Sequence, residues 1–224
     1  MARPHFIEFL LRPESKANDL KRRYDRAAYF YERNYPDLAL AEMYGVIQRY
    51  GNRPEADATL AVIHLQRYKQ THNQFDLNQA LAHALAVETS NPDDIAIKPV
   101  LGEILYHLNR TDNARFYLSD AFNNKNWCIS NKFACAKAAW FLGEILHKKK
   151  NFTKAARYYK SAISDPEHGR RASYMYAITL VESGQIEEAV PLLEDLLNDK
   201  TYKNNANRIL ERIYSKTTKP GKDR

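Results

Sequence analysis

This sequence has few of the residues on which β-structure and the commonest active sites depend. Its 224 residues include only seven glycines, nine prolines and two cysteines. The prolines lie mostly between apolar runs, a distribution that favours helices over a turn-rich β architecture. No glycine-rich phosphate loop and no HExxH string occurs, and no strained turn presents a nucleophile. We therefore expect a protein that is not an enzyme, with no catalytic residue, no cofactor and no metal site.

Cysteine is too scarce to build a disulfide framework. Cys128 and Cys135 lie seven residues apart and lack the second pair that a structural zinc site needs. We expect both to be buried, unreactive thiols in a reducing compartment.

Long apolar runs are also missing. The apolar cluster Phe6–Leu11 is interrupted by Glu8 and is too short for an export signal or a membrane span. No later segment approaches the length needed to cross a bilayer. These features predict a soluble, cytoplasmic protein without a membrane span, in which residues 1–17 form an N-terminal extension.

Charge is plentiful but unevenly distributed along the C-terminal half. Residues 132–171 hold ten basic and three acidic side chains, and residues 172–199 hold six acidic and no basic ones. Residues 200–224 are basic again, with eight basic and two acidic side chains. Such bands could steer a charged partner to one part of the molecule. Ordinary solvated helix faces of different charge would give the same pattern.

A repeat with a period of 34 residues is the strongest pattern present. Small and large apolar residues in one stretch meet residues of similar size 34 positions later. The first set is Ala139, Leu142, Gly143, Leu146, Ala155, Tyr159 and Ala162, and the second is Ser173, Tyr176, Ala177, Leu180, Ala189, Leu193 and Leu196. The pattern resembles that of the tetratricopeptide repeat, in which small residues let two antiparallel helices approach closely.

This resemblance implies an all-α protein, a right-handed α-solenoid (superhelix) of about five antiparallel helix pairs with a C-terminal capping helix. We expect units at about 20–54, 55–94, 95–131, 136–169 and 170–202, a cap at 203–216 and a disordered basic tail at 217–224. Residues 124–131 are expected to form a lengthened turn, and residues 71–75 a loop longer than the family norm. The register before residue 92 stays open.

In the tetratricopeptide family, ligand peptides usually lie in a concave groove lined by the first helix of each pair. The resemblance therefore implies a protein or peptide partner and no small-molecule substrate. The matching first-helix positions are Glu103, Tyr106, His107, Lys137, Trp140, Glu144, His147, Lys148, Arg171, Tyr174, Ile178 and Glu182.

Trp140 is the most informative of these positions, because interface hot spots favour tryptophan. Either it anchors a bound side chain in the groove, which we favour, or it packs against the 124–131 insertion. One class of ligand is disfavoured. Co-chaperones that grip a terminal carboxylate use Lys and Asn where this chain has Asp25 and Tyr29, and an Asp would repel that carboxylate.

The expected function is therefore a non-enzymatic interaction module (adaptor, scaffold or assembly factor) that binds a partner in its groove. One alternative is a structural or oligomeric subunit that uses convex or end surfaces. A second is a basic nucleic-acid-binding protein, motivated by Lys148–Lys150 near Tyr158, although cations at a helix C-terminus have a simpler role. His107 and His147 occupy related places in successive units, but groove or surface roles are favoured over metal ligation.

Overall fold

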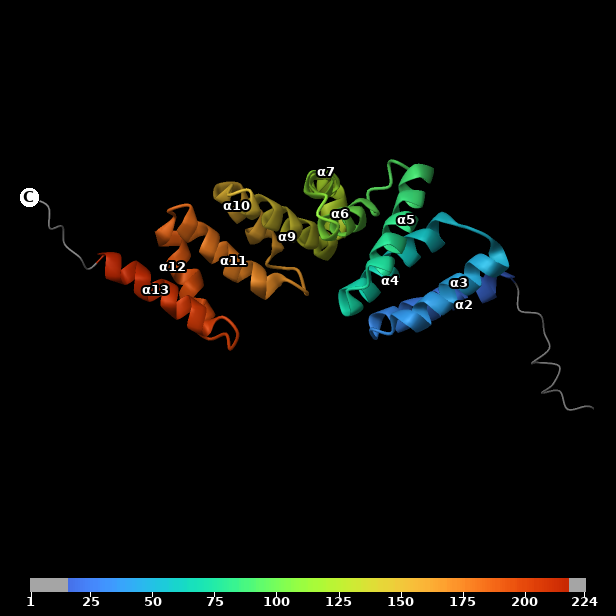
Figure 1. Ribbon diagram of the computed structural model, residues 1–224, viewed down its shortest axis with the longest axis horizontal. Coiled ribbons are helices and arrows are strands. Elements are labelled where there is room, and N and C mark those ends of the chain that lie inside the picture. The colour runs from blue at the N-terminus through green and yellow to red at the C-terminus, as the bar shows by residue number, and fades with distance from the viewer. Residues whose placement is uncertain (1–15, 218–224) are drawn as a thin grey trace, which may run out of the picture. The chain divides into compact units, whose positions relative to one another are not determined.

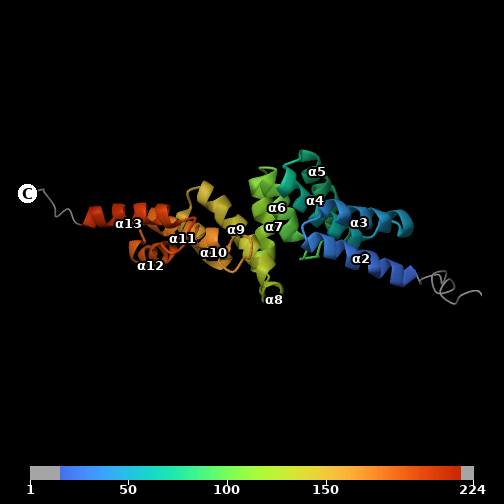
Figure 2. The same ribbon diagram turned by 90° about the horizontal axis from the view of Figure 1, so that it is seen from below.

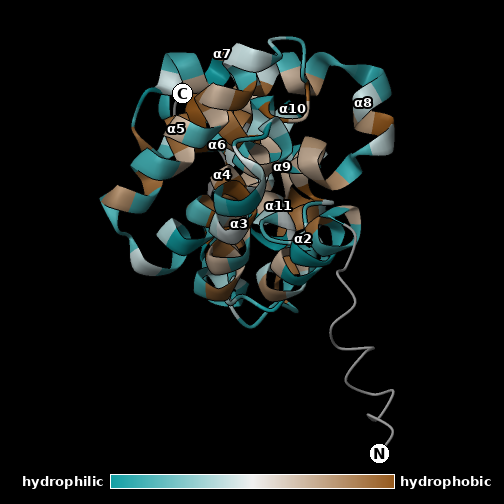
Figure 3. Ribbon diagram, turned by 90° about the vertical axis from the view of Figure 1, so that its right-hand side faces the viewer, coloured by the Kyte–Doolittle hydropathy of each residue, from teal (hydrophilic) through white to brown (hydrophobic). Residues whose placement is uncertain are grey.

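The computed structural model describes residues 16–217, which form twelve helices and no strand (Figure 1). The chain divides after Ile97 into two compact units, which are described separately. The helices labelled in Figure 3 carry both hydrophobic and hydrophilic residues, as expected of helices with one face packed against a neighbour. The all-α fold built of successive helix pairs, as in an α-solenoid, is thereby confirmed.

Unit 1 contains two helix pairs. They are α2 (Lys16–Glu32) with α3 (Pro36–Tyr50), and α4 (Pro54–Thr71) with α5 (Gln74–Ser90). Prolines begin α3 and α4, where a missing backbone N–H costs nothing. The core between the helices includes Ala27, Met43, Leu60 and Ile63, none of which is more than 1% exposed.

Unit 2 contains three pairs, a short insertion and a terminal helix. The pairs are α6 (Lys98–His107) with α7 (Thr111–Asn123), α9 (Lys132–Lys148) with α10 (Phe152–Ala162), and α11 (Gly169–Glu182) with α12 (Ile186–Leu196). Helix α8 (Lys125–Ser130) separates the first two pairs, and α13 (Lys203–Thr217) follows the third. Helix α13 packs against α12 (Figure 2) and buries Ala206, Leu210 and Ile213.

Glycine permits the close helix approach that the repeat spacing predicts. A Cβ atom placed on Gly143 would lie 2.7 Å from Tyr159 Cδ1, and one on Gly102 would lie 2.4 Å from Leu118 Cγ. Both distances are far below van der Waals contact. A side chain on the first helix would therefore push the second helix of the pair away.

The turns inside four of the five described pairs share one backbone conformation. Asn34, Asn109, Lys150 and Gly184 each have a positive φ, between 57° and 82°. At each turn the residue with positive φ donates its N–H to the carbonyl three positions back, and the next residue donates to the carbonyl five positions back. This is the Schellman arrangement that ends many helices. It fixes the register of the α2–α3 pair, which the sequence left open.

The α4–α5 turn has a different conformation from the other four, and it is shorter than the sequence predicted. Residues 71–75 were expected to form a long loop, but only His72 and Asn73 separate the two helices. His72 adopts a left-handed conformation, and the Asn73 side chain accepts a hydrogen bond from the Phe75 N–H. His72 is therefore the C-cap of α4 and Asn73 the N-cap of α5, and no longer loop is present between these helices.

The insertion between α7 and α9 corrects two further predictions. Within residues 124–131, Lys125–Ser130 form the helix α8 instead of a lengthened turn, and the Asn124 side chain caps it by accepting from the Trp127 N–H. Cys128 on α8 and Cys135 on α9 form a disulfide, with their Cα atoms 5.3 Å apart. The expectation of two free thiols was wrong, because α8 folds back and brings the first of them onto the first turn of α9.

Two predicted segments lie largely outside the described residues. These are the N-terminal extension before Lys16 and the basic tail after Thr217. None of the helices between these two points is long and apolar enough to cross a membrane.

Candidate interaction face

The first helices of the three pairs in unit 2 carry all twelve predicted groove residues. Side chains from α6, α9 and α11 bridge neighbouring helices, and we call this set of residues the first-helix face. Nine of the twelve take part in the contacts described in the next four paragraphs. They are Glu103, Tyr106, Lys137, Trp140, Glu144, His147, Lys148, Arg171 and Glu182.

Tyr106 and Glu144 connect α6 to α9. The Tyr106 hydroxyl donates to Glu144 Oε2 at 3.4 Å and accepts from Lys148 Nζ at 3.0 Å. The Tyr159 hydroxyl donates to the other Glu144 oxygen at 2.7 Å. Burial raises the pKa of Tyr159, and the Glu144 carboxylate raises it further. Tyr159 therefore stays protonated, and the two hydroxyls together hold the Glu144 carboxylate in a fixed position.

Trp140 lies beneath the face rather than on it. Only 3% of it is exposed. The indole stacks on His168, with ring centroids 5.0 Å apart and an interplanar angle of 15°, and the Arg171 guanidinium lies 5.2 Å from its centroid. Tyr159 meets it from the α10 side at 5.6 Å. These neighbours come from α10, α11 and the loop between them, rather than from the α8 insertion. A partner approaching the face meets Arg171 before it meets the indole.

Lys137 is surrounded by carboxylates. Its Nζ lies 2.9 Å from Glu167 Oε2. Burial would lower the pKa of Lys137, but the charges of Glu103, Glu167 and Asp165 outweigh burial and raise it. The ammonium is therefore a permanent charge at this site.

His147 and Glu182 join the basic band of the sequence to the acidic one, with His147 Nε2 2.7 Å from Glu182 Oε2. Arg170 makes a second link, to Asp195 at 3.1 Å and to Asp199 at 2.6 Å. The two charge bands are thus partly neutralised by each other. Their function as separate steering surfaces is correspondingly weakened.

The three other predicted residues lie apart from these contacts. His107 packs edge-on against Phe141, with centroids 5.9 Å apart. Tyr174 stacks on Tyr202 at 4.6 Å, beside α13. Ile178 is partly exposed on α11.

The loop from Asp165 to His168 completes the face, and sequence reasoning missed its role. Asp165 is 3% exposed and accepts hydrogen bonds from the Glu167 N–H at 2.8 Å and from His168 Nδ1 at 3.3 Å. These bonds hold His168 flat on Trp140. The signal was present in the sequence as an Asp–Pro step before a histidine, since aspartate often bonds the backbone two residues later.

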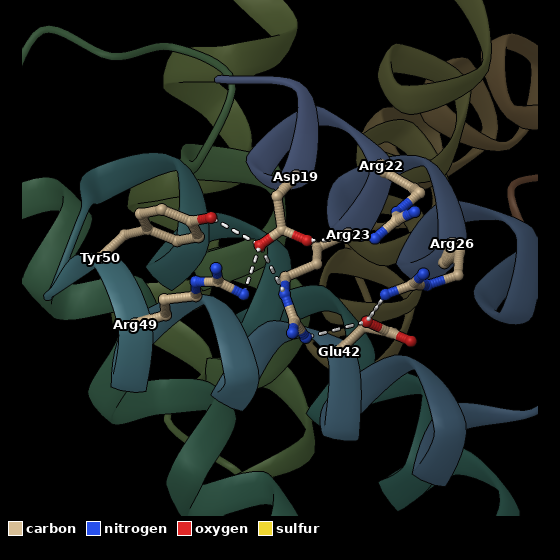
Figure 4. A network of polar contacts seen from close by, with 7 residues as sticks. All are labelled: Asp19, Arg22, Arg23, Arg26, Glu42, Arg49 and Tyr50. Atoms are coloured by element: carbon tan, nitrogen blue, oxygen red, sulfur yellow. Dashed lines mark hydrogen bonds and ion pairs between the residues drawn. The ribbon is translucent and has the colours of Figure 1, made fainter. Parts of the chain in front are cut away.

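Unit 1 contains a separate polar cluster around Asp19, shown in Figure 4. The Tyr50 hydroxyl donates to Asp19 at 2.5 Å, and Arg23 and Arg49 lie within 3.4 Å of the same carboxylate. The hydrogen bond from Tyr50 lowers the pKa of Asp19 most, and the arginines lower it further. Arg23 also forms an ion pair with Glu42, with its Nη1 3.3 Å from Glu42 Oε2. The cluster ties α2 to α3.

A second polar cluster in unit 1 is a chain of hydrogen bonds that joins the Tyr44 hydroxyl, the His64 imidazole and the Asp76 carboxylate. His64, 1% exposed, lies 2.8 Å from the Tyr44 hydroxyl and 2.9 Å from Asp76 Oδ1. Burial raises the pKa of Tyr44, so its hydroxyl stays protonated and is not a nucleophile at neutral pH. Arg67 neutralises Asp76 from 2.6 Å. The arrangement joins α3, α4 and α5, and within residues 16–217 no group of three or more His, Cys, Asp or Glu could hold a metal ion.

Comparisons with known proteins agree with this geometry. Residues 146–202 match the family model described as tetratricopeptide repeat. A solved structure of MamA is 17% identical and covers 84% of this chain and 96% of its own, with a TM-score of 0.55. Pseudomonas aeruginosa pilF is 13% identical and covers 90% of this chain and 95% of its own, with a TM-score of 0.65. At such low identity these structures establish the fold alone.

None of the curated protein sequences compared with the chain matches it. The family match nonetheless covers the segment from the end of α9 to the turn before α13, where the 34-residue period is clearest. Helix pairs, glycine contacts and matching turns extend the same pattern through the described residues. Residues 146–202 therefore contain a tetratricopeptide repeat, and the described residues on either side of them fold as helix pairs of the same kind.

Proposed function

We propose that this protein is a non-enzymatic adaptor or assembly factor that binds a peptide or protein partner on the first-helix face of unit 2. The observation that carries the proposal is the row of fixed, partly exposed charges along α9 and α11. Lys148, Arg171 and Glu182 are exposed, and each is held by a neighbouring side chain. Side chains that are already ordered lose little conformational entropy when a partner binds.

The partner that suits this face carries both signs of charge. Arg171 places its guanidinium over the Trp140 ring, with Cζ 5.2 Å from the ring centroid, and its N–H groups can donate to a carboxylate or a carbonyl. Glu182 offers acceptor atoms about three helix turns further along α11. A peptide with an acidic residue and a basic residue in corresponding positions would satisfy both.

Reversing one charge tests the proposal. Partners are captured from native extract by the full chain and by Arg171→Glu, and a captured partner is then titrated against the purified proteins. We expect Arg171→Glu to weaken binding at least about tenfold, the loss typical of a hot-spot arginine. Arg157→Glu is the matched control, because Arg157 is exposed on the second helix α10. Equal binding by both variants would exclude the first-helix face, provided that circular dichroism shows both to be folded.

One observation favours a second candidate, a structural subunit of a larger complex. Ile129 and Phe133 are 70% and 63% exposed beside the α8 insertion. Ile129 lies on α8 and Phe133 on the first turn of α9, and large exposed apolar side chains are typical of interaction sites. If this candidate is correct, Ile129→Asp should release the protein from its native complex in size-exclusion chromatography, whereas Arg171→Glu should not.

Nucleic-acid binding is less well supported by the geometry. Lys149 lies 2.6 Å from Asp112, and Lys148 lies 4.5 Å from the ring centroid of Tyr106. Tyr159 is fully buried. Lys148, Lys149 and the Tyr159 ring are thus engaged within the protein, which leaves fewer groups to contact phosphates and bases.

A cytoplasmic location is part of the proposal, and the Cys128–Cys135 bridge provides its test. Persistent disulfides are rare in the cytosol of most organisms. Alkylation of thiols in intact cells before lysis, followed by mass spectrometry, should label both cysteines if the protein is cytoplasmic. Recovery of the bridged peptide would contradict that location.

A further inference from the structure

A groove in unit 2 lies between the second helices α7 and α10 and has a volume of about 590 Å³. We call it the α7–α10 groove. Helix α9 packs against both of these helices and contributes Leu142 and Leu146 to the lining, which are 1% and 7% exposed. Charged and aromatic side chains of α7 and α10 line most of the remainder. None of the lining residues belongs to the first-helix face, so the groove is a separate surface of the same unit.

The helices α7 and α10 run in the same direction along the groove. Lys149, which precedes α10, has its Nζ 2.6 Å from Asp112 at the start of α7. Further along both helices, the Tyr158 ring meets the Phe122 ring edge-on, with centroids 5.2 Å apart. Residues near the start of α7 and residues near the start of α10 therefore lie at the same end of the groove.

The two carboxylates in the lining are neutralised by cations from outside it. Asp112 accepts a hydrogen bond from Lys149, and this bond lowers the pKa of Asp112 most. Asp120 accepts a hydrogen bond from Lys98 of α6. Neither lysine lines the groove. The negative charge of the groove is thus largely cancelled.

Two cations in the lining remain available to an occupant. Arg115 Nη2 lies 3.9 Å from the Asp112 carboxylate, which is too far for a hydrogen bond. Lys154 is exposed on α10, and its ammonium forms no ion pair within residues 16–217. Both cations lie near the start of their helices, so they stand at the same end of the groove, one on each wall. A carboxylate between them could accept charge-assisted hydrogen bonds from both walls.

The groove also has room for an apolar side chain. Phe116, next to Arg115, is 66% exposed and lines the groove together with the two leucines of α9. A large exposed ring beside a concave apolar surface is typical of binding sites. The α7 wall runs about 12 Å from Asp112 to Asp120, the length of about four extended residues. The occupant that suits this surface is therefore a short segment with a carboxylate and an apolar side chain.

We propose that the α7–α10 groove binds a short acidic segment of a partner protein. One carboxylate of the segment lies between Arg115 and Lys154, and an adjoining apolar side chain packs on Phe116 over the leucines of α9. A nucleic-acid strand suits the groove less well, because its evenly spaced phosphates would extend past the two cations towards Asp112 and Asp120. The inference goes beyond the proposed function and does not depend on it, since the groove shares no residue with the first-helix face.

Fluorescence anisotropy with the full chain tests the proposal. The probe is a labelled eight-residue peptide in which glutamates flank one leucine. Two comparison peptides carry lysine in place of every glutamate, or glycine in place of the leucine. We expect the acidic peptide to bind saturably and each comparison peptide to bind at least about tenfold more weakly. Equal binding of the three peptides, or no binding of the acidic one, would contradict the proposal.

Charge reversal in the protein locates the site. Lys154→Glu should weaken binding of the acidic peptide at least about tenfold, since it removes an attraction and adds a repulsion. Arg157→Glu is the matched control, because Arg157 is exposed on the same helix and does not line the groove. Arg115→Glu is the second groove variant if circular dichroism shows Lys154→Glu to be unfolded. An equal loss of affinity in groove and control variants would indicate general electrostatic attraction and would overturn the proposal.

Hydrogen exchange shows where the peptide lies. At saturating peptide, exchange should slow severalfold in residues 111–123 and 152–162 but not in residues 169–182. Slower exchange in residues 169–182 alone would place the peptide on the first-helix face, which overturns this inference and leaves the proposed function standing. A labelled oligothymidine that binds more tightly than the peptide, and that loses affinity in Lys154→Glu but not in Arg157→Glu, would assign the groove to nucleic acid instead.

Discussion

Gly143 and Tyr159 show how a single hydrogen atom sets the distance between two helices. The Tyr159 ring fills the space in which a Cβ of residue 143 would lie. We predict that Gly143→Ala lowers the free energy of unfolding by about 1–3 kcal/mol, the usual cost of overpacking a core. Thermal denaturation followed by circular dichroism measures the change. Ala136→Gly on the same helix is the comparison, because it exchanges the same two residue types in the opposite direction. It should also lose stability, but through a cavity and the lower helix propensity of glycine rather than through a steric clash.

His64 makes the stability of unit 1 depend on pH. Burial lowers the pKa of His64, although Asp76 opposes this effect. The unfolded chain therefore takes up a proton at a higher pH than the folded chain. Stability is complete above the unfolded pKa of about 6.5 and is lost as the pH falls towards the folded pKa, by at most about 1.4 kcal/mol per pH unit.

Urea denaturation between pH 7.5 and pH 5 measures this slope. His64→Gln should flatten it, whereas His72→Asn, at an exposed position in the same unit, should retain it. A slope that His64→Gln leaves unchanged would assign the pH dependence to other groups.

At the scale of the element, the turns within helix pairs combine a backbone conformation that favours glycine with residues that are mostly not glycine. Three of the four Schellman turns place a non-glycine residue at positive φ, and Lys150 is the least suited of these. We predict that Lys150→Gly raises the free energy of unfolding by about 1 kcal/mol. Gly184→Ala should lower it by a similar amount, because open space surrounds a Cβ there and only the backbone conformation is penalised. If both substitutions destabilise the protein, side-chain contacts of Lys150 outweigh the backbone.

At the scale of the whole chain, stability should spread only to nearest neighbours. Helix α13 covers α12 and buries Ile213 to 8% exposure. We predict that Ile213→Asp costs about 2–4 kcal/mol locally, through a buried unpaired charge. Hydrogen exchange should accelerate in α11, α12 and α13 but not in α4, since repeat proteins transmit stability through adjacent interfaces. Arg212→Asp, one residue away and exposed, is the control. Acceleration in unit 1 would contradict the nearest-neighbour description.

The architecture was predictable because the same residue pattern recurs in several repeat units, and each recurrence adds evidence for the same helix pair. A glycine at one position is weak evidence, but Gly102 and Gly143 in equivalent positions, each facing a large residue of the second helix, indicate a pair-by-pair packing rule. The α8 helix and its disulfide had no equivalent in another unit. Nothing in the sequence therefore distinguished them from a polar turn with two free thiols.

The composition of the first-helix face was predictable, but the depth of its side chains was not. Trp140 occupies one of the first-helix positions that match the groove of the family, which suggested exposure. Its burial depends on Arg171 and His168, which reach it from a different helix and a loop. Contacts of this kind depend on three-dimensional placement and leave no periodic mark in the sequence.

The disulfide between Cys128 and Cys135 gives the protein a chemical reporter of its own. The sequence holds no other cysteine, so a thiol reagent applied after mild reduction labels these two positions alone. Cys135 is 7% exposed and is bonded to Cys128 of α8, so we expect a reagent to reach it when the residues packed around it, those of α8 among them, move apart. The labelling rate of Cys135 therefore counts opening events of the insertion, and its change on adding a partner would show whether binding restrains that movement.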